Sequence, residues 1–140
     1  MQLNPYLTFN GNCEAAFTFY EQHLGAKVLF MMPFGDSPMP EPAPGWSSKV
    51  LHATLKLAGA VVMGSDTPPD RYRAPAGFMV ALSVDSAAEA QRIYDLLQEN
   101  GQVVMPLEKT FWAERFAMLT DRFGIPWSIS FEGAVSAPSS

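Results

Sequence analysis

The segment from Pro5 to Val28, PYLTFNGNCEAAFTFYEQHLGAKV, contains the pattern that decides the fold. It begins inside a short apolar run, Leu3 to Phe9, which ends in turn residues and predicts a strand. Apolar residues then recur at helical spacing, with Asn12 placed to cap the first turn and Gly25 placed to end the helix in a left-handed conformation. Lys27 to Met32 predicts a second strand. The segment therefore predicts a strand, a helix and a strand.

The rest of the first half predicts a hairpin that follows a long loop. Pro33 to Ser48 contains five prolines and cannot donate a regular ladder of hydrogen bonds, so we expect a loop. Loops of this length in compact domains are often functional covers or disordered segments. Lys49 to Leu57 alternates in polarity and predicts a strand, and Ala60 to Gly64 predicts its partner after a tight turn.

The second half repeats this order. Ser86 and Glu89 form an S-x-x-E capping box that opens a predicted helix, which runs to about Asn100 and stops at Gly101. Matching positions in the two halves carry the same residue type, such as Tyr20 and Tyr94 late in the two helices. The predicted strands of this half are Gly77 to Val84, Gln102 to Met105, Phe111 to Thr120 and Ile125 to Phe131, the last two joined by a turn that contains Gly124.

The predicted fold class is α+β, with two tandem βαβββ modules that form a curled mixed sheet around a cleft and carry their helices on the outside. We expect one domain over residues 1–140. Within it, module 1 spans about 1–65, a linker about 66–76 and module 2 about 77–132, and the tail 133–140 is expected to be loose.

Composition excludes several classes of protein. Hydrophobic residues make up 48% of the chain and charged residues 16%, which is enough apolar material for a core. The net charge of -5 and the scattered lysines and arginines argue against nucleic-acid binding. No apolar run is long enough to predict a membrane span, and no signal peptide is evident. The single Cys13 fits a reducing, cytoplasmic location.

Three blocks of the sequence resemble the PhnB-like branch of the vicinal-oxygen-chelate (glyoxalase/bleomycin-resistance/dioxygenase) superfamily. They are the opening segment quoted above, HATLKLAGAVVMGSD at 52–66 and FWAERFAMLTDRFGIPWSISF at 111–131. The resemblance implies the fold just described. It leaves the activity open, because the superfamily includes lyases, ring-cleaving dioxygenases, epoxide-opening transferases and drug-binding proteins. Nothing in the sequence resembles a methyl-donor site.

The resemblance also implies where a metal would bind. The His or Glu ligands of metal-dependent relatives would fall near Asn4 or Pro5, Met63, Met79 and Ser128. None of these is a strong ligand for a divalent metal. We therefore expect no metal site and no cofactor, with a divalent metal held by other residues as the alternative.

Three residues are candidates for lining a ligand pocket on the strands. His52 lies on the strand face opposite Ala53 and Leu55, so it is either a hydrogen-bonded, partly buried histidine or a ligand anchor and base. Glu114 is predicted to share a strand face with Trp112, where it is either paired in a salt bridge or a pocket carboxylate. Trp112 could stack on a planar ligand.

Two further positions and the proline loop complete the candidate set. Met63 and Ser128 occupy expected metal-ligand positions and are candidates for the pocket wall. Phe34 and Trp46 are candidates for a loop cover over an apolar ligand. The same side chains could instead pin the loop down or cover a dimer partner.

The sequence thus predicts a small-molecule-binding protein that holds an apolar or aromatic compound without a metal. One alternative is a metal-dependent lyase or dioxygenase-type enzyme that uses His52 and Glu114 as non-standard ligands. The other is a dimeric interaction module. A homodimer is expected in each case, because symmetric dimers are the commonest oligomers. Cys13 is expected to be a small buried or half-buried residue, and His23 a surface residue near the C-terminus of its helix.

Overall fold

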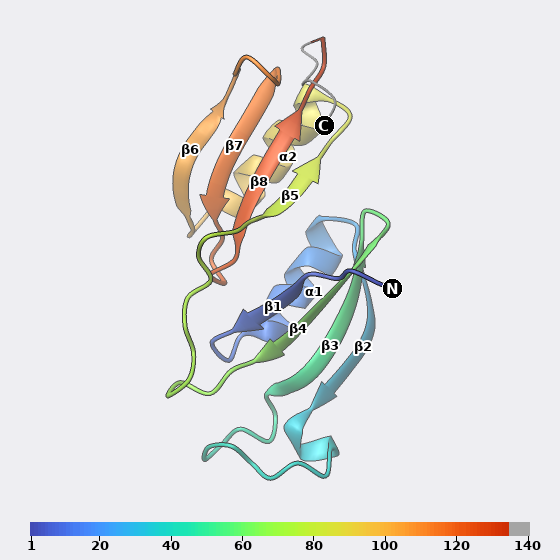
Figure 1. Ribbon diagram of the computed structural model, residues 1–140, viewed down its shortest axis with the longest axis vertical. Helices are drawn as coiled ribbons and strands as arrows, with labels where there is room; N and C mark the ends of the chain where they lie inside the picture. The colour runs from blue at the N-terminus through green and yellow to red at the C-terminus, as the bar shows by residue number, and fades with distance from the viewer. Residues whose placement is uncertain (135–140) are drawn as a thin grey trace. The chain divides into compact units, whose positions relative to one another are not determined.

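The computed structural model describes residues 1–134. This part of the chain contains two α-helices, one short 3-10 helix and eight strands, in the order βαβββ followed by βαβββ. The chain divides into two compact units, the first from Met1 to Ala74 and the second beginning at Pro75. Each unit holds one helix and one four-stranded mixed sheet (Figure 1). The prediction of an α+β protein with tandem βαβββ modules is confirmed.

Module 1 forms a sheet with the strand order β1-β4-β3-β2. Strands β1 and β4 are parallel, with Tyr6 opposite Met63, and the other pairs are antiparallel. A bulge in β2 between Val28 and Phe30 interrupts its pairing with β3. The elements are β1 (Tyr6–Phe9), α1 (Cys13–His23), β2 (Lys27–Pro33), a 3-10 helix (Phe34–Asp36), β3 (Val50–Leu57) and β4 (Ala60–Asp66).

Module 2 repeats this arrangement with the strand order β5-β8-β7-β6. Strands β5 and β8 are parallel, with Ala81 opposite Ser128. The edge strand β6 is bulged between Val103 and Met105, at the place that corresponds to the bulge in β2. The elements are β5 (Val80–Ser83), α2 (Ala87–Gln98), β6 (Gln102–Glu108), β7 (Arg115–Thr120) and β8 (Pro126–Phe131).

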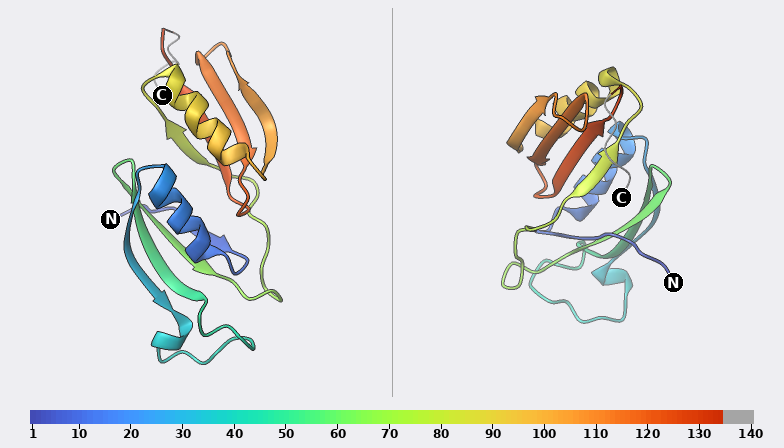
Figure 2. Two further views of the ribbon diagram at one scale, coloured as in Figure 1. Left: turned by 180° about the vertical axis from the view of Figure 1, so that it is seen from behind. Right: turned by 45° about the horizontal axis from the view of Figure 1, so that its top comes forward.

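In module 1, helix α1 covers one face of the sheet and forms the core there (Figure 2). Phe9 and Phe17 are fully buried and meet edge to face, with ring centroids 5.8 Å apart. The helix approaches closely because position 64 is glycine: a Cβ there would lie 2.8 Å from the Phe17 ring. Leu55 is buried on the same face, whereas Lys56 on the opposite face is exposed. The helix therefore leaves the other sheet face open.

Helix α2 covers one face of the second sheet in the same way (Figure 2). Trp127, Leu119 and Ile129 of the sheet are almost completely buried. Ile93 and Leu97 of the helix are buried as well, which defines the core of this module. The interpretation of Trp127 as a core residue is confirmed.

Of the two predicted N-caps, the one at Ser86 is confirmed and the one at Asn12 is wrong. Ser86 caps α2 as predicted, because its Oγ accepts a hydrogen bond from the Glu89 N–H at 3.1 Å. Asn12 occupies the N-cap position of α1 but makes no capping hydrogen bond, and its buried Oδ1 has no partner among the described residues. The first turn is held instead by Asp66, whose Oδ1 accepts from the Cys13 N–H at 2.9 Å.

The residue predicted to end each helix has the left-handed conformation after α1 but not after α2. Gly25 follows α1 with a φ of +67°, the left-handed conformation that was predicted. At the end of α2 the left-handed residue is Asn100, with a φ of +59°, rather than Gly101. Gly101 is needed for a different reason, since a Cβ there would collide with the carbonyl oxygen of Thr120.

Several predicted boundaries are wrong. Strand β4 extends to Asp66, which was assigned to the linker, because the buried carboxylate ties the strand end to α1. Strand β7 begins at Arg115 rather than Phe111. The hydroxyl of Thr110 accepts a hydrogen bond from the Ala113 N–H at 3.2 Å and closes a turn where the strand was expected. As a result Trp112 and Glu114 precede the strand instead of alternating along it.

Two further predictions concern the C-terminal tail and membrane-spanning helices. Gly133 and Ala134 form a turn, and the remainder of the predicted loose tail lies outside the described residues. Over residues 1–134, neither α1 nor α2 has the length and the apolar character that crossing a bilayer requires.

Candidate functional site

The face of the first sheet that α1 leaves uncovered holds an unusual polar pair. We call it the module 1 open face and define it by the side chains opposite the buried positions of the strands. Register partners on neighbouring strands share a face, so the pairing of the strands identifies its members. They are Tyr6, Thr8, Lys27, Phe30, Met32, His52, Thr54, Lys56, Val61, Met63 and Ser65.

Tyr6 and His52 meet on this face across the intervening strand β4. The Tyr6 hydroxyl and His52 Nδ1 are 3.0 Å apart and share a hydrogen bond. Their ring centroids are 5.7 Å apart. The Tyr6 side chain is 46% exposed, so the pair is accessible from solvent. His52 is thus a partly buried, hydrogen-bonded histidine, and its place on the strand face opposite Ala53 agrees with the alternation of the sequence.

The pair keeps one proton available whichever way its hydrogen bond runs. If the Tyr6 hydroxyl donates to Nδ1, the neutral imidazole carries its proton on Nε2, which is then a free donor. If Nδ1–H donates to the Tyr6 oxygen, the phenolic O–H is the free donor. Neither the Tyr6 nor the His52 side chain makes another hydrogen bond among residues 1–134. A ligand oxygen placed beside the pair would therefore meet one N–H or O–H group.

Apolar side chains surround the pair. The Phe30 ring centroid lies 6.2 Å from that of His52, and Phe30 is 45% exposed. Met32 is opposite His52 in the ladder, and Met63 is opposite Tyr6. Methionine adapts to irregular shapes, so these neighbours suit a planar apolar body. The arrangement provides one polar contact within an apolar setting.

The second sheet has its own uncovered face, the module 2 open face, and it is chemically different. Ser128 is opposite both Ala81 and Met118 there, and it is buried. Phe116 follows along β7, and the Trp112 ring packs on it with centroids 5.2 Å apart. This face presents methionine, serine and aromatic groups, without a counterpart of the tyrosine–histidine pair among the residues described.

Glu114 lies apart from the aromatic groups of this face. Its backbone N–H donates to the Glu132 carbonyl oxygen at 3.2 Å, which places it beside the end of β8. Its carboxylate lies against the backbone of Gly133, so closely that a Cβ at position 133 would collide with it. Glu114 thus faces the start of the C-terminal turn and not a row of strand residues.

The proline loop is anchored by the two aromatic residues that were candidates for a cover. Phe34 and Trp46 are both buried and meet edge to face, with centroids 6.2 Å apart. Glu41 fixes the same turn, since its Oε1 accepts from the Trp46 N–H at 2.8 Å and the Ser47 N–H at 3.2 Å. These contacts hold the two ends of the loop together, with both aromatic side chains buried.

The residues present do not fit a divalent metal of the kind that the resemblance implies. The four expected ligand positions carry Asn4 or Pro5, Met63, Met79 and Ser128, none with an imidazole or carboxylate group. Over the whole described range, no group of three or more His, Cys, Asp or Glu side chains is arranged to hold a metal ion. These residues therefore do not form the set of three protein ligands that holds a catalytic metal and leaves a position open for substrate.

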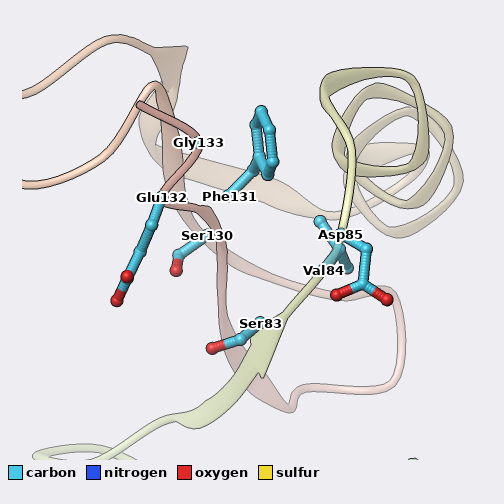
Figure 3. Close-up of a pocket in the computed structure, with 7 residues that line it drawn as sticks. All are labelled: Ser83, Val84, Asp85, Ser130, Phe131, Glu132 and Gly133. Carbon is cyan, nitrogen blue, oxygen red and sulfur yellow. The ribbon is translucent and has the colours of Figure 1, made fainter. Parts of the chain in front are cut away.

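A pocket of about 430 Å³ lies in module 2 at the ends of β5 and β8 (Figure 3). Ser83 and Ser130, which are register partners, point to one side together with Glu132, while Asp85 and Phe131 point away from them. None of the predicted site residues lines this pocket. Its lining includes two carboxylates, Asp85 and Glu132, and no histidine or cysteine.

Cys13 is buried and His23 lies on the surface, as the sequence predicted. Cys13 is fully buried, and burial together with the carboxylates of Asp66 and Glu14 raises the pKa of its thiol well above the usual value. Such a thiol is protonated at neutral pH and is a poor nucleophile. His23 is exposed on α1, where its ring lies 4.6 Å from that of Phe19.

Tyr6 and Asp66 are the residues that the sequence did not single out. The alternation of β1 contained the signal for Tyr6, because Leu7 and Phe9 must face the core and Tyr6 must then face the other way. No local pattern marks Asp66, because its two partners, Cys13 and Val50, lie far away in the sequence.

Comparison with known proteins places this architecture in a family. The Glyoxalase/Bleomycin resistance protein/Dioxygenase superfamily matches residues 2–129. The chain is similar to Protein YjdN of Escherichia coli, with 36% identity over 93% of this chain and 95% of that protein.

The chain is also similar to proteins whose structures have been solved. The chain is similar to protein PA1353 from Pseudomonas aeruginosa, with 47% identity, a TM-score of 0.86, and coverage of 94% of this chain and 98% of that one. It also shares its fold with a PhnB protein from Bacillus cereus described as a putative 3-demethylubiquinone-9 3-methyltransferase, with 22% identity, a TM-score of 0.80, and coverage of 94% and 99%. With two βαβββ modules and a match over nearly its whole length, the chain belongs to the Glyoxalase/Bleomycin resistance protein/Dioxygenase superfamily.

Proposed function

We propose that this protein binds a small apolar or aromatic molecule on the module 1 open face and does so without a metal. The observation that carries the proposal is the exposed hydrogen bond between the Tyr6 hydroxyl and His52 Nδ1, 3.0 Å long, on a sheet face that is otherwise apolar around it. A ligand with an aromatic body and one oxygen would use both features. The oxygen would accept the free proton of the pair, and the body would cover the neighbouring side chains.

The apolar part of this interaction rests on exposed aromatic area. Phe30 and Tyr6 keep almost half of their surface in water. Covering such area with a planar molecule is favourable by about 25 cal/mol per Å² of apolar surface removed from water. Aromatic pairs add about 0.5–1.5 kcal/mol when the rings stack or meet edge to face. These contributions suit a planar ligand better than a compact polar one.

The polar part sets the orientation of the ligand. A neutral hydrogen bond from the pair contributes about 0.5–1.5 kcal/mol, which corresponds to about two- to tenfold in affinity. Because the hydrogen-bonded pair is exposed to solvent, we expect the ligand oxygen to reach it without displacing either side chain. In this proposal the pair supplies the polar contact to the ligand oxygen, and no metal is needed for it.

On module 2, Trp112 stays a proposed aromatic contact of the module 2 open face, independent of the ligand site on module 1. Its ring packs on Phe116 and is only partly covered. Met63 and Ser128 stay proposed as wall residues of the two open faces, and Glu114 as a polar group at the end of β8. We propose no contact from Phe34 or Trp46, because both side chains are buried within module 1.

Titration calorimetry with 2-naphthol, a planar aromatic molecule with one hydroxyl group, tests the proposal. We expect saturable binding that is weakened about fivefold by His52→Ala and about threefold by Tyr6→Phe, since each change removes a neutral hydrogen-bonding group. His23→Ala and Tyr94→Phe are matched controls, because these residues lie on the helices. Both controls should bind like the unmodified chain.

A variant that combines His52→Ala, Trp112→Ala and Glu114→Gln examines the whole proposed set. It should bind 2-naphthol at least as weakly as His52→Ala does, while its circular dichroism spectrum keeps the native shape. Unchanged binding in this variant would rule out the proposal, because no proposed contact would then matter.

Elemental analysis of the purified protein, without chelator or nickel affinity chromatography, tests the metal-free part. We expect far less than about one divalent ion per chain, before and after soaking in divalent salts. A stoichiometric metal that is lost in His52→Ala would favour the metal-dependent enzyme instead. The homodimer and the cytoplasmic location also remain proposals, and sedimentation velocity measures the first of them.

A further inference from the structure

The module 1 open face carries a second feature, which lies at the other end of the same strands. Lys27 of β2 and Lys56 of β3 are directly opposite each other in the ladder. Both lysines are exposed and lie on the same side of the sheet as His52. Like charges directly opposite one another are unfavourable in a sheet, so the pair gains from any anion that it can share.

No carboxylate of this module neutralises the two lysines. Neither Lys27 nor Lys56 has an ion-pair partner among residues 1–134. The nearby Glu21 is occupied elsewhere, since its Oε2 accepts a hydrogen bond from the Val28 N–H at 2.7 Å. The open face is therefore locally cationic, in a chain whose net charge is -5.

The module 2 open face lacks this feature. The residues that correspond to the lysine pair there are Gln102 and Thr120, which are also opposite each other in the ladder. The charged residue on that face is Glu108, paired with Phe116. The two modules share a fold, but only the first combines a cationic end with a hydrogen-bonding aromatic pair.

The spacing of the two features defines a length. His52 and Lys56 are four residues apart on one strand, so their Cα atoms are separated by about 13 Å. Thr54 lies between them on the same face and is opposite Met63 and Phe30 in the ladder. A flexible lysine side chain shortens the gap, so a ligand of the length of two fused rings with a substituent at each end reaches both features.

We propose that the ligand is an elongated aromatic anion, with an oxygen at one end for the Tyr6–His52 pair and a carboxylate or similar anionic group at the other end for Lys27 and Lys56. This inference rests on the proposed function and names the chemical class of its ligand. The apolar body would lie over Thr54, Met63 and Phe30. The two lysines would attract the anionic group of the ligand. Because the two ends of the ligand differ, it would bind in one orientation.

Three probes of the same ring size separate the two contributions. The probe 6-hydroxy-2-naphthoate has both ends, 2-naphthol lacks the carboxylate and 2-naphthoate lacks the hydroxyl group. We expect 6-hydroxy-2-naphthoate to bind most tightly of the three. Its advantage over 2-naphthol should be about three- to fivefold at low salt, the size of an exposed charge interaction. Added salt should reduce this advantage, because it screens exposed charges.

Variants assign the advantage to the lysines. Lys56→Gln and Lys27→Gln should each remove most of the preference for 6-hydroxy-2-naphthoate and leave the binding of 2-naphthol unchanged. Lys109→Gln is the matched control, an exposed lysine of module 2, and should leave the preference intact. Because both substitutions are at exposed positions, the variants are expected to fold.

The outcomes distinguish this inference from the proposed function beneath it. If 2-naphthol binds through His52 but 6-hydroxy-2-naphthoate binds no better, or if Lys56→Gln and Lys27→Gln leave the preference intact, the anion inference is wrong and the proposed function stands. If none of the three probes binds, the proposed function fails and the inference fails with it.

Discussion

Each module contains a buried carboxylate at the end of a strand, and the two carboxylates organise their modules in different ways. Asp66 and Asp121 are each only 4% exposed. Asp66 accepts from the backbone N–H groups of Cys13 and Val50, and so ties the end of β4 to the starts of α1 and β3. Asp121 accepts from the N–H groups of Phe123 and Ile125 and so shapes the turn that follows it.

The two carboxylates differ in how far away in the sequence their hydrogen-bond partners lie. The partners of Asp66 lie 53 and 16 residues away in the sequence, so this carboxylate works only once the module has assembled. The backbone partners of Asp121 lie two and four residues away, and α2 has its own local cap in Ser86. Module 1 therefore depends on a long-range carboxylate for contacts that module 2 makes within short segments.

The largest expected effect comes from removing the long-range carboxylate. Asp66→Ala leaves the N–H groups of Cys13 and Val50 buried without their acceptor, and should lower the free energy of unfolding by about 3 kcal/mol. Urea denaturation followed by circular dichroism measures it. A loss below about 1 kcal/mol would mean that the contacts of Asp66 are not needed to hold module 1 together.

Trp127→Phe tests the corresponding carboxylate of module 2. The indole Nε1 donates to Asp121 Oδ2 at 2.8 Å, and both groups are buried. Losing this donor and part of the ring volume should lower the free energy of unfolding by about 2 kcal/mol. The loss should be smaller than that of Asp66→Ala, because the two backbone N–H groups that donate to Asp121 keep their acceptor. A cost greater than that of Asp66→Ala in the same urea assay would reverse the comparison.

Ser86→Ala removes the local cap of α2. The cost should be about 1 kcal/mol, as is usual for an N-cap serine. In module 1, Asn12→Ala should have a smaller effect, because the Asn12 side chain makes no capping hydrogen bond. Thermal unfolding of the two variants side by side checks the order. A larger loss for Asn12→Ala would show that the asparagine does cap α1 in solution.

The smallest effect is expected at the surface of α2. Hydrogen bonding to Arg92 lowers the pKa of the exposed Glu89 carboxyl group. A group whose pKa is lowered in the folded state adds stability above its unfolded pKa and loses it as the pH falls through the folded value. Glu89→Gln should therefore cost at most about 0.5 kcal/mol near neutral pH and nothing in strong acid. A loss that persists in acid would contradict this assignment.

Most of the fold could be predicted from the sequence, because it depends on local patterns. The capping by Ser86, the left-handed Gly25 and the alternation that places His52 opposite Ala53 all depend on neighbours within a few residues. Asp66 was assigned to a linker, since the polar and proline-rich residues after it conceal a strand end that is fixed by partners elsewhere.

The candidate site was predicted only in part, for the same physical reason. His52 was found from its strand face, but its partner Tyr6 lies 46 residues earlier, and only the β1–β4–β3 pairing brings the two together. Trp112 and Glu114 were placed on one strand because their spacing alternates. The hydroxyl of Thr110 captures the N–H of Ala113 and ends that pattern before the strand begins.

The contrast between the two open faces is the basis of the proposed function, and chemical-shift mapping tests it most directly. Two-dimensional ¹H–¹⁵N and aromatic ¹H–¹³C spectra would be recorded during a titration with 2-naphthol. We predict that the earliest and largest shifts fall on Tyr6, His52 and Phe30 of the module 1 open face. Shifts concentrated instead around Ser83 and Ser130, in the pocket of Figure 3, or absent from Tyr6 and His52, would contradict the account.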